Sequence, residues 1–281
     1  MPPFGSERGE GEVRIRFRFT KLGKIRFTSQ RDVARMWERA LRRDLFPMAY
    51  TAGFSPRPQL SFGLALPTGC ESLAEYLDVT VDETRLEAQA LEASACPARL
   101  TPLLPDGIEV TAAGVPDVGA DSLQELVSSC AWTVRVIGMS RAELEDRVSV
   151  ALAADHLPIL RQRKGRSVTD DLRPSILSLE VTGERDSNDR EPGGADLVAE
   201  LATKPRGVRP GELLGALFAP TGPAASQPSA DGEDRAGPML YRACRTNQWI
   251  ECDGSRQEPL SETGGTPGLP LHPTPSLERA S

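Results

Sequence analysis

Residues 12–45 read EVRIRFRFTKLGKIRFTSQRDVARMWERALRRDL. The first nine residues alternate apolar and cationic side chains, which is the period of a strand with one buried and one solvent-facing side. The apolar side holds Val13, Ile15, Phe17 and Phe19, and the solvent-facing side holds Arg14, Arg16 and Arg18. From Ser29 the period becomes helical, with Asp32 three residues on in a loose capping-box arrangement. The stretch therefore predicts a strand followed by a helix.

The helix predicted from Ser29 has two chemically different faces. At about 100° per residue, one arc is apolar and holds Val33, Ala34, Met36, Trp37, Ala40, Leu41 and Leu45. The opposite arc holds Arg31, Arg35, Arg39, Arg42 and Arg43. Trp37 belongs to the apolar arc, so we predict that it is a core residue and not a base-stacking platform. Strand and helix thus both present arginines on the sides predicted to be exposed.

The order of the remaining elements predicts an α+β protein. In the first half, short strands around 48–51 and 60–66 precede a strand over 73–83, a helix over 84–95 and a strand over 107–115. This β-α-β-β-α-β order indicates a ferredoxin-like sandwich with helices on one face of an antiparallel sheet.

The second half repeats that order without a residue-level repeat. We expect strands at 126–138 and 157–163, a hairpin over 174–203 and a closing strand pair at 239–252, with helices at 140–154 and 209–218. Residues 167–174, SVTDDLRP, are predicted to form a turn. Two tandem ferredoxin-like (βαββαβ) sandwiches are therefore predicted. The first is a basic domain over residues 12–118, preceded by a flexible N-terminus over 1–11. The second domain covers 124–252 with flexible insertions at 184–195 and 220–238, and a disordered tail over 253–281 follows it.

Charge is distributed unevenly along the chain. The net charge is −7, yet residues 11–60 hold twelve Lys or Arg against four Asp or Glu, a local balance of +8. A basic module on an acidic protein is a candidate polyanion-binding face, although exposed arginines can also serve only solubility. The five cysteines are scattered, and neither a membrane-length apolar run nor a secretory signal is recognisable, so we expect a cytoplasmic protein.

A glycine- and proline-rich loop follows the helix. Residues 53–69 read GFSPRPQLSFGLALPTG and contain one cation, Arg57. Gly53, Gly63 and Gly69 allow the backbone to approach a ligand, and the prolines stiffen the segment. Arginine suits phosphate or a base edge. The alternative is that the prolines only shape a turn while Arg57 pairs with Glu71 or Glu75.

Evidence for catalysis or a cofactor is weak in the sequence. No cysteines are spaced for an iron–sulfur cluster, and the two histidines, His156 and His272, give no zinc pattern. A lone histidine such as His156 is more often structural than a general base. The adjacent Asp170 and Asp171 fit the predicted turn. We therefore predict no catalytic residue, no metal and no cofactor.

The chain resembles the radical-SAM-linked (radical-SAM-associated) family of unknown function. The resemblance covers roughly residues 12–250 and is carried by RFRFTKLGKIRFTSQRDVARMWERALRR, YTAGFSPRPQLSFGLALPTGCESLAEYLDV, DLRPSI, RGVRPGELLGAL and RTNQW. It implies a radical-SAM partner protein, encoded separately for stand-alone members, which are typical of actinobacteria. A looser similarity to RAMP-type CRISPR endoribonucleases implies paired ferredoxin-like domains that hold RNA. The first domain has no histidine, however, so a histidine-based cleavage site is not expected.

Together these features predict a non-catalytic accessory protein that binds structured RNA, such as tRNA or rRNA, or docks a radical-SAM partner. The residues predicted to bind are Arg14, Arg16, Arg18, Arg26, Arg31, Arg35, Arg39, Tyr50 and Arg57, with Gly53, Gly63 and Gly69 shaping the loop. One alternative is a protein-only adaptor whose arginines meet an acidic partner surface. Another is a metal-independent RNA-processing enzyme that uses Tyr50, Arg57 and an aspartate.

Overall fold

The computed structural model describes residues 11–89, 92–116, 122–163, 166–188, 192–219, 241–252 and 255–260. The first half contains β1 (Glu12–Lys21), η1 (Gly23–Phe27), α1 (Gln30–Arg43), β2 (Leu60–Phe62), β3 (Glu71–Asp82), α2 (Glu83–Ala88), η2 (Ala93–Ala95), α3 (Cys96–Leu100), η3 (Thr101–Leu103) and β4 (Val110–Gly114). The second half contains α4 (Leu123–Leu126), β5 (Val127–Ile137), α5 (Arg141–Ala153), β6 (Pro158–Arg163), β7 (Arg166–Asp171), η4 (Arg173–Ser175), β8 (Ile176–Arg185), β9 (Gly194–Ala202), α6 (Pro210–Leu217), β10 (Tyr241–Cys252) and β11 (Ser255–Gln257).

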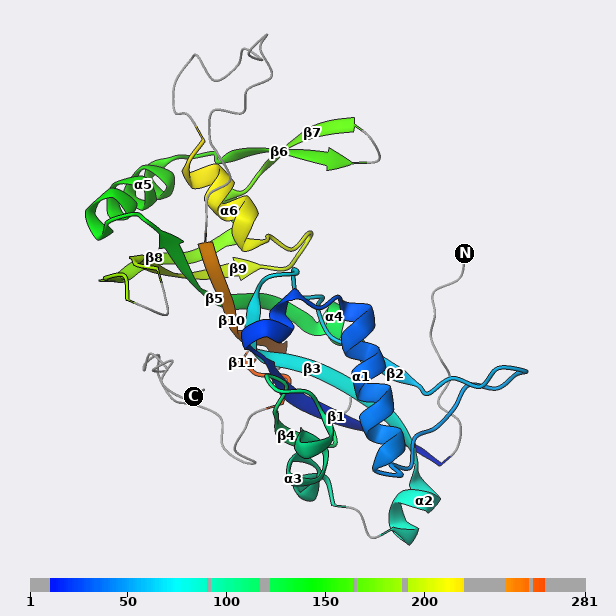
Figure 1. The fold of residues 1–281 in the computed structure, drawn as a ribbon. Helices are drawn as coiled ribbons and strands as arrows, with labels where there is room; N and C mark the ends of the chain where they lie inside the picture. The colour runs from blue at the N-terminus through cyan, green and yellow to red at the C-terminus, as the bar shows by residue number, and fades with distance from the viewer. Residues whose placement is uncertain are drawn as a thin grey trace.

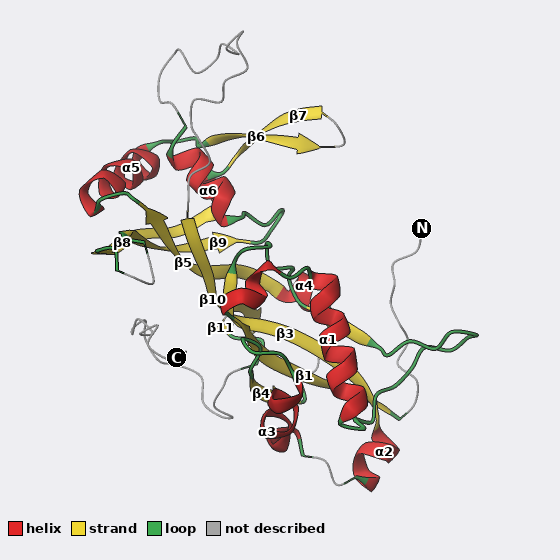
Figure 2. Ribbon diagram, viewed as in Figure 1, coloured by secondary structure: helices red, strands yellow, loops and turns green. Residues whose placement is uncertain are grey.

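A nine-stranded mixed sheet runs through both halves (Figures 1 and 2). Seven strands lie in the order β4-β1-β3-β10-β5-β9-β8, while β2 pairs with β3 and β11 pairs with β10. Helix α1 crosses the sheet of the first half, and α5 and α6 lie over that of the second (Figure 1). The predicted α+β class is therefore confirmed, with one large mixed sheet. Within the described residues, no helix is long and apolar enough to cross a membrane.

The core of the first half lies between α1 and the sheet. Trp37 of α1 is fully buried, and its ring lies 5.5 Å from that of Phe17 and 5.0 Å from that of Phe19. Its predicted core position is confirmed. The helix begins as predicted, because the Ser29 hydroxyl accepts a hydrogen bond from the backbone N–H of Asp32 (3.2 Å). The apolar period of residues 12–45 thus fixes which face of α1 is buried.

The strand predicted around residues 48–51 is wrong in extent. Met48 and Tyr50 form only isolated bridges, to Val81 and Pro58 respectively. Pro58 has no N–H, so a regular ladder cannot continue through this pair. The Met48–Val81 bridge and the hydrogen bond from the Ala49 N–H to the Thr80 carbonyl (2.8 Å) nevertheless hold the segment against β3, and the Tyr50–Pro58 bridge joins the two ends of the loop that follows.

The second half departs from the expected order at one inserted hairpin. The strand predicted over 157–163 forms as β6, but it pairs with β7 in a separate two-stranded sheet. The turn predicted over 167–174 is therefore wrong for residues up to Asp171. The β-branched Val168 and Thr169 favour the extended backbone and take part in the ladder with β6. Figure 1 shows this hairpin standing away from the large sheet.

Strand β10 joins the two halves. The closing strand pair predicted over 239–252 is wrong, because Tyr241–Cys252 form one strand, with an irregular register between Arg245 and Asn247. The strand is antiparallel to β5 and runs parallel to the start of β3, where Arg245 is opposite Ser72. No local pattern in the sequence indicates this long-range parallel pairing.

Residues 255–260 contradict the disorder predicted for 253–281. They form β11 and a short continuation, which we call the C-terminal strap, and Leu260 packs in a small cluster with Tyr76 and Leu123. Residues 261–281 and the insertion predicted at 220–238 lie outside the described residues. At the insertion predicted over 184–195, β8 extends to Arg185 and β9 begins at Gly194, and residues 189–191 lie outside the described residues.

The strap covers the polar side of β1. Arg16 and Arg18 are only 4% and 5% exposed, so their predicted exposure to solvent is wrong. Arg16 Nη1 donates to the Pro259 carbonyl (3.2 Å), and Arg18 forms an ion pair with Glu258 (3.4 Å). Alternation along β1 correctly separates the two sides of the strand, but both sides are covered in the fold.

Candidate functional site

Helix α1 presents a row of exposed arginines on the side opposite its core. Arg31, Arg35, Arg39, Arg42 and Arg43 are all exposed, as the helical period predicts. The row follows from amphipathic spacing, because α1 buries Val33, Trp37, Ala40 and Leu41 against the sheet. This helix therefore supplies most of the positive charge at the site described below.

The loop over residues 51–57 is closed by a hydrogen-bonded neck. The Thr51 N–H donates to the Arg57 carbonyl (2.9 Å), and the Arg57 N–H donates to the Thr51 hydroxyl (3.1 Å). One step further in, the Gln59 N–H donates to Ala49 O (3.0 Å). Arg57 thus leaves the neck at a fixed backbone position, with proline on each side of it. The residues between the two ends of the neck are exposed.

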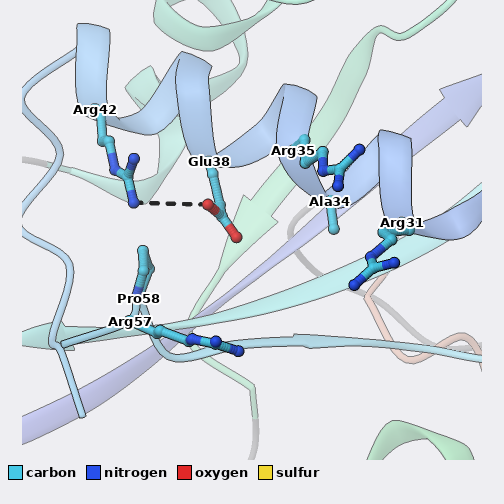
Figure 3. A pocket seen from close by; sticks show the side chains of 7 residues that line it. All are labelled: Arg31, Ala34, Arg35, Glu38, Arg42, Arg57 and Pro58. Atoms are coloured by element: carbon cyan, nitrogen blue, oxygen red, sulfur yellow. Dashed lines mark ion pairs between the residues drawn. The ribbon is translucent and has the colours of Figure 1, made fainter. Parts of the chain in front are cut away.

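A groove lies between α1 and this loop (Figure 3). It has a volume of about 430 Å³ and is lined by Arg31, Ala34, Arg35, Glu38, Arg42, Arg57 and Pro58. Figure 3 shows the Arg57 side chain extending beneath α1 and facing the helix arginines across the opening. We call this feature the arginine groove. It holds four guanidinium groups from two segments of the chain and one carboxylate.

Little of this positive charge is neutralised within the protein. Arg42 forms an ion pair with Glu38 (3.6 Å), and Arg35 pairs with Asp32 (3.2 Å), both at exposed positions where such pairs are weak. Among the described residues no carboxylate lies within 4 Å of the guanidinium group of Arg31 or that of Arg57. The groove is therefore suited to bind an anion that supplies several oxygens.

The alternative partners of Arg57 are engaged elsewhere. Glu71 accepts a hydrogen bond from Arg26 (3.2 Å), and Glu75 accepts one from Arg245 (2.6 Å). The alternative in which Arg57 pairs with either glutamate is therefore wrong. The side chain of Arg57 remains available to a ligand.

Four arginines predicted at the site lie apart from the groove. Arg14 and Arg16 both pair with Asp78 on the strap side of the sheet, at 3.5 and 2.7 Å, and Arg18 pairs with Glu258 on the same side. Arg26 pairs with Glu71 and lies over the ring of Phe27, 4.7 Å from its centroid. None of the four lines the groove.

The predicted loop residues differ in whether their polar groups are available to a ligand. Tyr50 is partly exposed and forms a bridge with Pro58 at the neck. The N–H groups of Gly63 and Gly69 donate to the carbonyls of Tyr76 and Arg26, so these two amides are already used. Gly53 has a φ of +125°, and no atom lies within 4 Å of the position that a Cβ would occupy there, so it shapes the exposed end of the loop.

Sequence reasoning missed four residues that line the groove, namely Ala34, Glu38, Arg42 and Pro58. Ala34 belongs to the predicted apolar arc of the helix. Arg42 belongs to the arginine arc of the helical wheel, and that period is a sufficient signal for it. Glu38 is four residues before Arg42, which is the spacing of a helical ion pair. The sequence indicates the prolines only as stiffening or shaping the loop, so it does not assign Pro58 to the site.

A buried polar cluster near the β3–β10 junction was not predicted. Arg245 is 2% exposed, and Nη2 donates to Glu75 (2.6 Å) and to the Leu64 carbonyl (2.8 Å). Burial raises the pKa of the nearby Cys70 thiol to about 11, against the opposing effects of Arg245 and Lys21. This thiol is therefore protonated near neutral pH and is a poor nucleophile. The cluster connects the two halves rather than forming a reactive site.

The side chain of His156 contacts Asp171 at the protein surface. It is 82% exposed, and Nδ1 lies 2.8 Å from Oδ2 of Asp171. Asp171 also accepts hydrogen bonds from the N–H groups of Leu157 and Arg173, so it fixes the backbone after β7. Within the described ranges no group of three or more His, Cys, Asp or Glu side chains is arranged to hold a metal ion.

Comparison with protein families identifies the chain. The family described as "Uncharacterized protein conserved in bacteria (DUF2344)" matches residues 14–209. The chain belongs to this family. The match to DUF2344 includes α1, the loop and therefore every residue that lines the arginine groove. No curated protein matches the chain.

Among solved structures, this DUF2344 protein is similar to one chain of the "Crystal Structure of a Cbf5-Nop10-Gar1 Complex". The two are 12% identical, with a TM-score of 0.38, and the alignment covers 83% of this chain and 49% of the other. The protein thus spans about half the length of the chain it resembles.

Proposed function

We propose that this protein is a non-catalytic accessory module that binds RNA through the arginine groove and works with a radical-SAM protein encoded separately. The observation that carries the RNA proposal is the convergence of Arg31, Arg35, Arg42 and Arg57 on one groove. Guanidinium groups bind phosphate oxygens with bidentate geometry, and a polynucleotide presents phosphates at regular intervals. The proposal of a radical-SAM partner rests on the family resemblance of the sequence. No contact among the described residues is used to support it.

The arrangement of charge favours a polyanion over a single small anion. Beyond the groove, α1 continues with exposed Arg39 and Arg43, which have no carboxylate partner among the described residues. The loop and the segment after it, residues 50–70, contain no Asp or Glu. A ligand that extends along α1 therefore meets arginines from Arg31 to Arg43, which outnumber the two carboxylates, Asp32 and Glu38, on the same helix. Such a surface also raises the rate of encounter with nucleic acid.

We further propose that each half is a ferredoxin-like unit. In the first half, β4-β1-β3 and the pairing of β2 with β3 support a β-α-β-β-α-β arrangement. In the second half, β10-β5-β9-β8 supports the same order, with the β6–β7 hairpin inserted after α5. The proposal concerns topology only, because the β3–β10 pairing makes the sheet continuous. The predicted boundaries 12–118 and 124–252 remain predictions.

RNA binding is tested by the salt dependence of affinity for a labelled structured RNA. The protein is compared with Arg31→Glu/Arg35→Glu and with Arg85→Glu/Arg147→Glu, which makes the same charge change at exposed positions on α2 and α5. We expect the groove variant to bind at least about tenfold more weakly and to lower the salt slope by more than about 1, since each lost phosphate contact removes about 0.7–0.9. The control variant should keep the wild-type affinity and the wild-type salt slope. Binding that is insensitive to salt, or equally weak in both variants, contradicts the proposal.

The radical-SAM partner is tested by capture with tagged protein from a native lysate, with and without ribonuclease. Recovery of a radical-SAM protein that depends on RNA supports an RNA-bridged complex. Recovery that survives ribonuclease but is lost in Arg31→Glu/Arg35→Glu supports the protein-only adaptor, with the groove as its docking surface. Absence of any radical-SAM protein contradicts the partner proposal and leaves the RNA proposal to the affinity measurement.

A further inference from the structure

We infer that the arginine groove receives a single-stranded segment of a polynucleotide, one unpaired base of which stacks on Phe54. This inference rests on the proposed function and adds the form of the ligand. Phe54 lies at the end of the 51–57 loop and is fully exposed. Among the described residues, no ring or cation lies over its ring.

The neck limits how far Phe54 can lie from the groove. Phe54 is three positions before Arg57, so the two Cα atoms are at most about 10 Å apart. The neck hydrogen bonds between Thr51 and Arg57 hold both ends of the loop, and the prolines at 56 and 58 restrict its backbone. Less conformational freedom is therefore lost when the loop binds a ligand. A base on Phe54 and a phosphate at Arg57 can belong to neighbouring nucleotides.

The surroundings of Phe54 favour a base over an apolar pocket of another protein. Its neighbours in the loop are small or cationic, namely Ala52, Gly53, Ser55, Pro56 and Arg57. A protein-docking aromatic is normally surrounded by other contact residues that exclude water from it. A lone ring with small neighbours leaves room for a flat base, and base–aromatic stacking requires no particular base identity.

The same geometry favours a single strand over a duplex. A base pair within a helix is stacked on both faces, so a protruding ring can reach a base face only at an unpaired nucleotide or at the end of a duplex. Proteins that hold single strands combine a positively charged groove along the backbone with aromatic side chains for the bases. The arginine groove and Phe54 supply these two parts within one short region of the chain.

Phe27 offers a matched comparison within the same half. It is also an exposed phenylalanine, but the guanidinium of Arg26 lies over its ring, 4.7 Å from the centroid. It does not line the groove. Substitution of Phe27 therefore changes exposed aromatic surface without removing the proposed stacking partner.

The test measures affinity for polyuridine carrying one 2-aminopurine, for the equivalent DNA strand and for a blunt RNA duplex. The proteins are wild type, Phe54→Leu, Phe54→Trp and Phe27→Leu. We expect Phe54→Leu to weaken single-strand binding roughly five- to hundredfold, which is the range for loss of one stacked base. The salt slope should not change, because no phosphate contact is lost. Phe54→Trp and Phe27→Leu should bind like wild type, and stacking should quench the 2-aminopurine fluorescence only when residue 54 is aromatic.

Several outcomes overturn the inference, and they are distinct from failure of the proposed function. If Phe54→Leu binds like wild type while Arg31→Glu/Arg35→Glu loses binding, RNA binding stands and the stacking inference is wrong. If the duplex binds as tightly as the single strands, the preference for unpaired nucleotides is wrong. If no nucleic acid binds and Phe54→Leu instead abolishes capture of a protein, both proposals are wrong. Preference for RNA over the DNA strand, or the reverse, identifies which polynucleotide is the ligand.

Discussion

Arg16 and Asp78 form a two-pronged ion pair between neighbouring strands, with Nε 2.7 Å from Oδ1 and Nη2 2.9 Å from Oδ2. Both side chains are buried beneath the C-terminal strap, and the same guanidinium donates to the Pro259 carbonyl. The pair occupies directly opposed positions of β1 and β3. The arginine side of β1, which the sequence predicted to bind a polyanion, is thus covered by other parts of the protein.

We predict that Asp78→Asn destabilises the protein by about 3–5 kcal/mol, because it leaves a buried arginine without its counter-charge. Urea denaturation measures the loss. Glu145→Gln is the control, since Glu145 pairs with Arg141 at exposed positions on α5 (2.6 Å) and its loss should cost less than about 1 kcal/mol. Equal stability of Asp78→Asn and Glu145→Gln would show that the buried pair contributes nothing beyond a surface pair.

The Arg245–Glu75 pair should show strong energetic coupling. Each single change, Arg245→Met or Glu75→Leu, leaves a charge in a buried environment and should cost about 3–5 kcal/mol. The double variant removes both charges, so we expect it to be more stable than the sum of the single losses implies, by more than about 1 kcal/mol. Urea denaturation of the four proteins gives this coupling. Simple additivity would mean that the two residues contribute independently.

The elements near the start of the chain could be predicted because their signals are local. The period of residues 12–45 gives the strand, the start of α1 at Ser29 and the burial of Trp37. The same period does not indicate whether another segment of the chain covers the polar side of the strand. Arg16 meets Asp78 and Pro259, which are far away in the sequence, so its burial depends on tertiary contacts that alternation does not encode.

The candidate site likewise contains residues that local sequence predicts and residues that only tertiary contacts place there. The helix arginines follow from the wheel, whereas the approach of Arg57 to α1 depends on the neck and on the backbone hydrogen bonds of Ala49 and Gln59 with Thr80 of β3. Composition marked the glycine–proline loop as unusual but gave no reason to select Phe54. The structure singles it out because its ring is fully exposed three positions before Arg57, which lines the groove.

Asp171 should make stability depend on pH in the acidic range. Hydrogen bonds from His156 and from the Leu157 N–H lower the pKa of this carboxyl below its usual value. Because the folded state has the lower pKa, the contribution is fully present above the unfolded pKa and is lost as pH falls through the folded one. We expect Asp171→Asn to lower stability by about 1 kcal/mol at pH 7, with the difference shrinking as the pH falls below about 4.

Urea midpoints across this pH range test the prediction, and Asp155→Asn is the control. Asp155 is exposed, and its carboxylate has no hydrogen-bond or ion-pair partner among the described residues. Its substitution should have little effect at any pH. A difference for Asp171→Asn that stays constant down to about pH 3 would show that charge on Asp171 does not stabilise the fold.

Glu38 should weaken the binding of a polyanion to the arginine groove. Among the described residues it is the one carboxylate that lines the groove, and it lies 3.6 Å from the guanidinium of Arg42. Glu38→Gln removes this negative charge and releases Arg42 for a phosphate. We therefore expect affinity for single-stranded RNA to rise by roughly two- to tenfold at low salt, and the gain to shrink as salt screens the interaction.

The control is Glu145→Gln, which makes the same charge change at a helical ion pair on α5, outside the groove, so the affinity of this variant should match wild type. Fluorescence polarisation at about 50 and about 200 mM salt measures both variants. Unchanged or weaker binding by Glu38→Gln would contradict the placement of a ligand phosphate near Glu38, because removal of a neighbouring anion should raise the affinity for that phosphate.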